Sequence, residues 1–133
     1  MGMHFKDIVH ECTTGSDNGT LTFPQVVAML MAAGVERYHA DLSRSERTYY
    51  LPDGTSEVVP AHMVATSAGE TFAAEDIVAA LRAIQAKDIG YAEFCERIAA
   101  AGCVGYVVSL VGRRVVYSGR SGDFYVEKFP GAK

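Results

Sequence analysis

Apolar residues recur at helical spacing in two stretches of the chain, residues 23–30 and residues 91–98. Each stretch follows a residue that can cap a helix, Thr22 in the first case and Gly90 in the second. A glycine comes shortly after each stretch. Because glycine readily takes the left-handed conformation that closes a helix, the pattern predicts two amphipathic helices that end at Gly34 and Gly102.

Three short strands are predicted after each of these helices. Apolar and polar residues alternate over residues 37–42, which is typical of a strand with one buried and one solvated face. Val107 occupies the place that His39 has in the first stretch, so we expect the corresponding second strand to be covered on both faces. Further strands are expected near residues 48–51, 55–59, 115–117 and 123–129, with glycine-containing turns between them.

The two stretches match one another at a spacing of 68 residues, the separation of Gly34 from Gly102. Eight residues are identical at this spacing, and in the first stretch they are Ala32, Ala33, Gly34, Tyr38, Leu42, Tyr49, Gly54 and Val58. We interpret the pattern as an internal duplication with pseudo-repeats 22–58 and 90–126. The duplication predicts a positive φ at both glycines that end the helices.

The remaining segments complete one domain. Residues 5–12 have the spacing of a short amphipathic helix, which the run from Gly15 to Gly19 is expected to break. A helix near residues 72–86 is expected to join the repeats, and residues 62–66 are expected to form a short strand. We therefore predict an α+β fold, a single domain of residues 1–133 in which helices cover one side of a shared sheet or of two facing sheets.

Composition and charge narrow the function classes. A chain of 133 residues with 49% hydrophobic residues can bury a core, and no apolar run approaches the length of a membrane span. The three cysteines form no paired motif, which favours free thiols in a reducing cytoplasm, and Cys95 is expected to be a buried structural thiol. The net charge of −4 disfavours nucleic acid as a partner, although Arg113, Arg114 and Arg120 cluster near the C-terminus.

The most suggestive polar residues are Arg37, His39 and Asp41, which the alternation places on one face of one strand. A histidine near a carboxylate can act as an acid or a base, or bind a metal if His62 joins it. A solvated strand face gives the same pattern. No glycine-rich phosphate-binding motif is present, and the sequence predicts no cofactor and no resident metal.

Seven tyrosines are a second notable feature. Tyr38 and Tyr106 are expected to lie in the core. Four others are expected either to pack across strands or to line a cleft where the two halves meet, namely Tyr49, Tyr50, Tyr117 and Tyr125.

Several short motifs together resemble a known bacterial family. They are Tyr91-Ala92-Glu93-Phe94-Cys95, the Tyr49-Tyr50 pair before Gly54, the Ala-Gly helix end before Tyr106, and the closing Val126-Glu127-Lys128-Phe129-Pro130. In combination they are similar to domain-of-unknown-function family 1398, whose members are sometimes labelled phage envelope proteins, over residues 5–130. The resemblance implies a small bacterial or prophage-borne protein and supplies no catalytic residues.

These observations predict a non-enzymatic ligand-binding or protein-interaction module, with an unknown small molecule or protein as its partner and a homodimer as one expected assembly. Its contact surface is expected to include Arg37, His39, Asp41, Tyr49 and Tyr50. The alternative is a small hydrolase or transferase that uses His39 and Asp41. Binding of nucleic acid through the basic residues near the C-terminus is a third, less favoured class.

Overall fold

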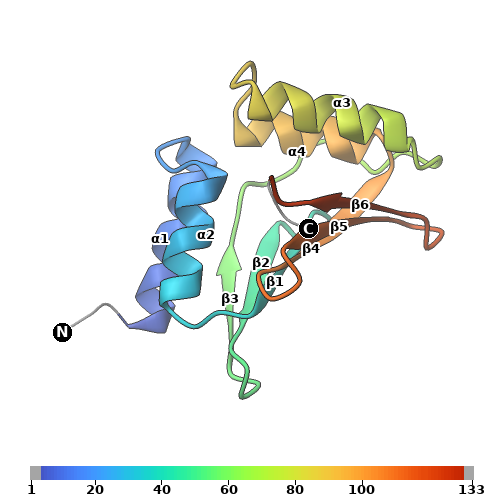
Figure 1. Cartoon of the computed structure of the whole chain (residues 1–133). Coiled ribbons are helices and arrows are strands. Elements are labelled where there is room, and N and C mark those ends of the chain that lie inside the picture. The colour runs from blue at the N-terminus through green and yellow to red at the C-terminus, as the bar shows by residue number, and fades with distance from the viewer. Residues whose placement is uncertain (1–3, 131–133) are drawn as a thin grey trace.

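The computed structural model describes residues 4–130 as four helices and six strands. Two helices and three strands follow one another along the chain, and the same order is then repeated (Figure 1). The elements are α1 (Phe5–Asn18), α2 (Phe23–Ala32), β1 (Arg37–Asp41), β2 (Glu46–Tyr50), β3 (Ser56–Pro60), α3 (Ala74–Gln85), α4 (Tyr91–Ala100), β4 (Cys103–Ser109), β5 (Arg114–Gly119) and β6 (Phe124–Lys128).

All six strands belong to one antiparallel sheet in the order β3-β2-β1-β4-β5-β6. The two halves of the chain join where β1 pairs with β4 at the centre. Of the two arrangements that the sequence left open, the structure therefore has the shared sheet. The predicted α+β class and the single domain with helices packed on the sheet are confirmed.

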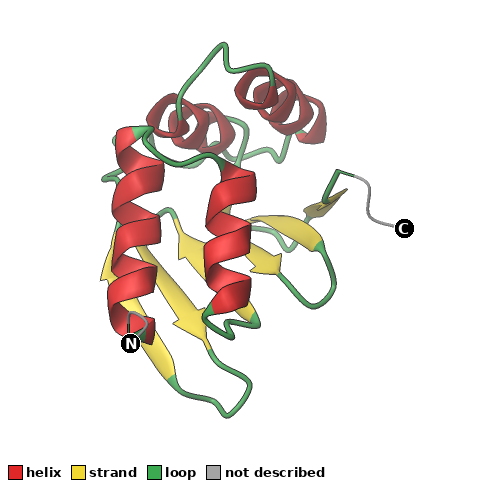
Figure 2. Cartoon of the chain, turned by 60° about the vertical axis from the view of Figure 1, so that its left-hand side comes forward, coloured by secondary structure: helices red, strands yellow, loops and turns green. Residues whose placement is uncertain are grey.

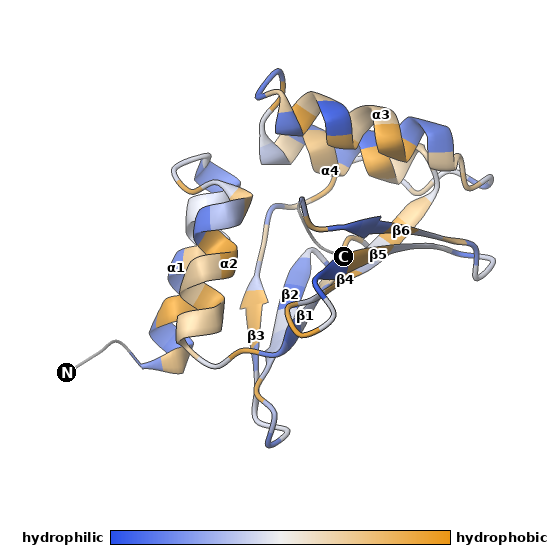
Figure 3. Ribbon diagram, in the orientation of Figure 1, coloured by the Kyte–Doolittle hydropathy of each residue, from blue (hydrophilic) through white to orange (hydrophobic). Residues whose placement is uncertain are grey.

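Both helix pairs lie on the same face of the sheet, α1 with α2 toward the first half and α3 with α4 toward the second (Figures 1 and 2). The predicted start of α2 is confirmed in detail. The Thr22 hydroxyl accepts a hydrogen bond from the Gln25 N–H, and the Gln25 side chain accepts one from the Thr22 N–H. Hydrophobic and hydrophilic residues alternate around α3 and α4 (Figure 3), as expected of helices that bury one stripe.

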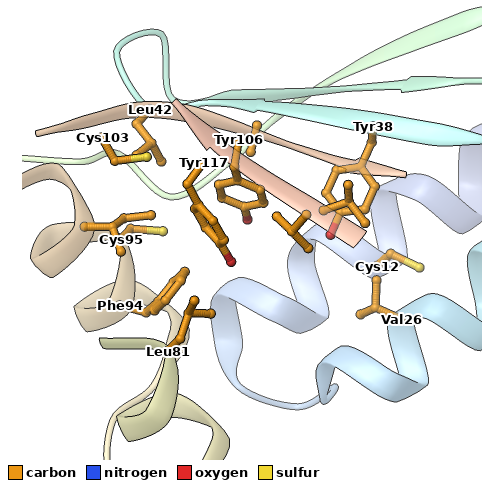
Figure 4. Close-up of a cluster of buried hydrophobic side chains, with 14 of the residues drawn as sticks. Cys12, Val26, Tyr38, Leu42, Leu81, Phe94, Cys95, Cys103, Tyr106 and Tyr117 are labelled. Atoms are coloured by element: carbon orange, nitrogen blue, oxygen red, sulfur yellow. The ribbon is translucent and has the colours of Figure 1, made fainter. Parts of the chain in front are cut away.

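The core lies between the sheet and the helices. Tyr38, Tyr106 and Tyr117 extend from the sheet toward the helices, where they meet apolar residues such as Val26 and Phe94 (Figure 4). The prediction that Tyr38 and Tyr106 are core residues is confirmed, since they are 2% and 5% exposed. All three cysteines are buried with free thiols, as predicted for Cys95. Burial raises the pKa of the Cys12 and Cys95 thiols to about 11.

The duplication is visible in every element. Each helix and strand of the first half has its counterpart 68 residues later, and the unit starts at α1, whose counterpart is α3. The residues with positive φ also match at this spacing, in the pairs Gly19 and Lys87, Gly34 and Gly102, Ser45 and Arg113, and Gly54 and Gly122. The predicted positive φ of Gly34 and Gly102 is confirmed. The structural repeat is thus longer than the sequence stretches that revealed it.

Three local predictions were wrong. The first helix continues through Gly15 to Asn18 and ends only at the last residue of the predicted break, Gly19, which has the left-handed conformation. Gly15 is a packing residue instead, since a Cβ there would lie 2.4 Å from Leu21 Cδ1. Residues 62–66 form no strand, and their backbone is held instead by the Glu96 side chain of α4. Val107 is 36% exposed on the face that the helices leave free, so β4 is not covered on both faces by the described chain.

Among the described residues, no helix combines the length and the apolar character that crossing a bilayer requires.

Candidate functional site

The face of the sheet opposite the helices, called here the open face, carries four of the five predicted contact residues. Arg37, His39 and Asp41 lie on it at alternate positions of β1, as the sequence predicted. Tyr50 lies beside Arg37 on β2, and the Arg37 guanidinium sits 4.2 Å from the centre of its ring. Tyr49 does not belong with them. It is fully buried on the helix-covered face, because successive strand residues point to opposite faces.

Strand register arranges the open face in three rows that cross all six strands. The central row is mostly apolar, and from β3 to β6 it consists of Val58, Thr48, His39, Val107, Val116 and Val126. Val58 is 50% exposed. Val107, Val116 and Val126 are adjacent and form one apolar surface on this uncovered face, whereas Thr48 and His39 separate Val58 from them.

The rows on either side of the central one differ in charge. One contains Ser56, Tyr50, Arg37, Ser109, Arg114 and Lys128, and the other contains Pro60, Glu46, Asp41, Gly105, Ser118 and Phe124. The first row has three basic residues and no acidic one, and the second has two acidic residues and no basic one. The open face is therefore an apolar stripe between a basic and an acidic edge.

A shallow depression of about 290 Å³ lies on this face beside His39 and Asp41. It exists because Gly105, the neighbour of Asp41 on β4, has no side chain to fill it. A Cβ at this position would lie 3.1 Å from His39 Nε2, so the imidazole reaches over the glycine. The depression is lined further by Ser43, Val104, Tyr106, Val107 and Ser118.

The carboxylate of Asp41 stabilises a turn. Its Oδ1 atom accepts hydrogen bonds of 3.0 Å from the backbone N–H groups of Ser43 and Arg44, which fixes the turn between β1 and β2. No hydrogen bond joins His39 to Asp41 among the described residues. The hydrolase or transferase alternative therefore stays a prediction without a formed acid–base pair.

His62 does not join His39. Its Nε2 atom lies 3.1 Å from a Glu96 carboxylate oxygen of α4, so its partner belongs to the helix layer. Within residues 4–130, no group of three His, Cys, Asp or Glu side chains is arranged to hold a metal ion. Of the basic residues near the C-terminus, Arg114 bonds to the Gly112 carbonyl and Arg120 to the Ala68 carbonyl.

The sequence interpretation missed Arg47 of β2. It is 2% exposed, on the same face as Tyr49, and its Nη1 donates a hydrogen bond of 3.2 Å to the Tyr49 hydroxyl. The guanidinium carbon lies 5.4 Å from the ring centre of Tyr38 and 4.8 Å from that of Tyr91. One signal could have found it, since Arg47 stands where the second repeat has Val115.

No protein-family model matches the chain, and no curated protein matches it at a significant level. The resemblance to family 1398, the bacterial or prophage origin and the cytoplasmic location consequently stay predictions.

Proposed function

We propose that this protein is a non-enzymatic interaction module that pairs with a second copy of itself through the open face. The observation that carries the proposal is the apolar part of the central row, in which Val107, Val116 and Val126 lie side by side on β4, β5 and β6 with no helix over them. No polar residue separates these three valines, whereas a sheet face adapted to water would be expected to have polar residues between them. Removing these valines from water supplies the main favourable free energy of the pairing.

The charged edges favour a second copy as the partner. A two-fold axis along the central row would lay the basic edge of one copy on the acidic edge of the other. Arg37 would then face the partner's Asp41, and the same contact would occur twice, as a closed symmetric dimer requires. Aligned packing of two sheets face to face is an established arrangement for antiparallel sheets.

The size of the face sets the expected affinity. Six strands of about five residues span roughly 500 Å², given about 4.8 Å between strands and about 3.3 Å per residue. Two such faces bury roughly 1,000 Å², which is at the lower end of specific interfaces. We therefore expect a dimer that dissociates in the micromolar range rather than an obligate one.

The decisive experiment compares two variants by sedimentation equilibrium of the full chain over a range of concentrations. Val107→Glu places a charge in the central row, whereas Val111→Glu places the same charge in the β4–β5 turn, where Val111 is already 79% exposed. We expect wild type and Val111→Glu to dimerise alike and Val107→Glu to remain monomeric with an unchanged circular dichroism spectrum. A monomeric wild type at high concentration, or equal dimerisation of all three proteins, would overturn the proposal.

A further inference from the structure

Arg47 is a buried cation without an acidic partner. It is 2% exposed, and none of the ion pairs in residues 4–130 includes it. Its Nη1 donates a hydrogen bond to Tyr49, but its Nε atom is buried and has no hydrogen-bond partner in the described part of the chain. A buried charge is costly unless it is paired, and a buried donor without an acceptor adds to that cost.

The duplication shows that the fold does not need a charge at this place. The counterpart of Arg47 in β5 is Val115, which is 5% exposed, and the counterpart of the buried Thr13 is Leu81. The second repeat thus fills the same two positions with apolar side chains. In the first repeat the Thr13 hydroxyl instead lies 2.8 Å from the Tyr49 hydroxyl and supports the residue that holds Arg47.

The groups around Arg47 do not balance its charge. Burial raises the pKa of Tyr38, Tyr91 and Tyr106, so these hydroxyls stay neutral at physiological pH. The arginine itself keeps its proton in proteins. The Cys12 and Cys95 thiols are neutral as well, as described above. The tyrosine hydroxyls and the thiols around the guanidinium are therefore polar but uncharged.

Asp17 of α1 is the acidic residue whose charge interacts with Arg47. Burial raises the pKa of Asp17 and the positive charge of Arg47 opposes that rise. The ion pairs found within residues 4–130 do not include one between these two side chains. The Oδ1 atom of Asp17 is buried and also lacks a hydrogen-bond partner among residues 4–130. The site thus contains two buried groups that each have an unused hydrogen-bonding position, one a donor and one an acceptor.

The side of the Arg47 guanidinium that makes no described hydrogen bond indicates the kind of ligand that could bind there. With Nη1 engaged by Tyr49, no hydrogen bond from Nε or Nη2 occurs among the described residues, and these two atoms form one side of the planar fork. This side matches the two oxygens of a carboxylate. We propose that Arg47 binds the carboxylate of a small organic acid through this side of the fork.

The position in the fold fits a ligand site. The cluster draws on β1, β2, β4, α1 and α4, and thus on both halves of the duplication. The hydroxyls of Tyr91 and Tyr106 are 2.5 Å apart and close it on the side of the second repeat. Tyr91, the first residue of α4, is partly exposed, and movement of its ring is the access route that we infer. This site lies on the opposite side of the sheet from the dimer surface and does not depend on it.

The first test uses the full chain in its natural sequence. Thermal denaturation is followed with sodium acetate, propionate or benzoate, with sodium chloride at matched ionic strength, and with acetamide and benzamide as neutral analogues of the same shape. We expect the melting temperature to rise with increasing carboxylate beyond the chloride control, and the amides to have no effect. An equal rise with chloride or the amides, or no rise at all, would overturn the proposal.

The second test replaces the guanidinium of Arg47. Arg47→Val copies the second repeat and is expected to fold, to melt at a higher temperature than wild type without ligand, and to lose the response to carboxylates. Arg47→Lys keeps the positive charge but lacks the planar guanidinium, and it provides the test if the valine variant does not fold. We expect its affinity for the best carboxylate to fall about tenfold. A lysine variant that binds as tightly as wild type, or a valine variant that retains the response, would contradict the assignment.

Discussion

His39 and Val107 face each other across the central strand pair, and each is also the counterpart of the other in the duplication. A local two-fold axis of the fold therefore passes between these two residues. Both occupy the centre of the open face, one in each repeat. The duplicated chain thus has a polar residue, His39, and an apolar residue, Val107, in two equivalent environments.

This relationship predicts that His39→Val will fold normally. The second repeat shows that valine fits this position, and we expect the free energy of unfolding to change by about 0.5 kcal/mol or less. Urea denaturation of monomeric protein at low concentration measures the change. A loss of several kcal/mol would mean that His39 holds the sheet together through contacts that Val107 does not make.

The two helix-ending glycines are predicted to differ in their tolerance of a side chain. Both have positive φ, but a Cβ at Gly34 would meet no atom of residues 4–130 within 4 Å, whereas one at Gly102 would lie 2.4 Å from the Thr71 carbonyl oxygen. Gly34→Ala should destabilise by about 1 kcal/mol through backbone strain alone. Gly102→Ala should cost roughly 2 kcal/mol more, because backbone atoms must move.

The duplication alone would predict equal costs, so chemical denaturation of the two variants separates symmetry from local packing. The crowding at Gly102 comes from Thr71 and Phe72 in the connection before α3, and no described atom lies as close to Gly34. Equal destabilisation by the two alanine variants would show that the Thr71 backbone can move aside without a loss of folding free energy.

Glu96 is predicted to link stability to acid pH. Its carboxylate accepts hydrogen bonds from the Thr66 hydroxyl at 2.6 Å and from the backbone N–H groups of Thr66 and Ala65, and it lies 3.1 Å from His62 Nε2. These contacts, above all those of Thr66 and His62, lower the pKa of Glu96 from 4.5 to about 2. Because the pKa is lower in the folded state, the stabilisation is complete above about pH 4.5 and is lost as the pH falls toward 2.

Glu96→Gln should therefore destabilise the protein at pH 7 by about 1–2 kcal/mol, a modest value because the side chain is partly exposed. The difference from wild type should shrink between pH 4.5 and pH 2. Glu93→Gln is the matched control on the same helix, since Glu93 is 52% exposed and pairs only with Arg97 among the described residues. Urea denaturation at several pH values provides the measurement. A difference that does not depend on pH would show that the carboxylate charge is not what holds the connection.

The sequence predicted the second helix and the strands of each repeat because their signals are local. Glycine at a helix end, a capping residue at a helix start and apolar alternation in strands act over a few residues. The sequence did not reveal α1 and α3 as copies of one another, because they share no identical residue at the spacing of 68. What they share is burial at equivalent places, Val9 with Ile77 and Cys12 with Ala80.

The candidate site was predictable in part for the same reason. Alternation placed Arg37, His39 and Asp41 on one face, but assigning Tyr49 to that face with Tyr50 broke the rule that strand neighbours point to opposite sides. Arg47 was missed because a charged residue in a strand is ordinarily expected to face water. The adjacency of Val107, Val116 and Val126 could not be read from the sequence, since it depends on strand order and register.

The central claim, self-pairing through the open face, is tested most directly by contacts between two copies. A sample mixed from isotope-labelled and unlabelled protein allows an NMR experiment that detects only magnetisation transfer between copies. We predict transfer from the methyl groups of Val107 and Val116 to protons of the unlabelled copy, and none from Val111. Transfer confined to the helices, or its absence at a concentration where sedimentation shows a dimer, would contradict the account.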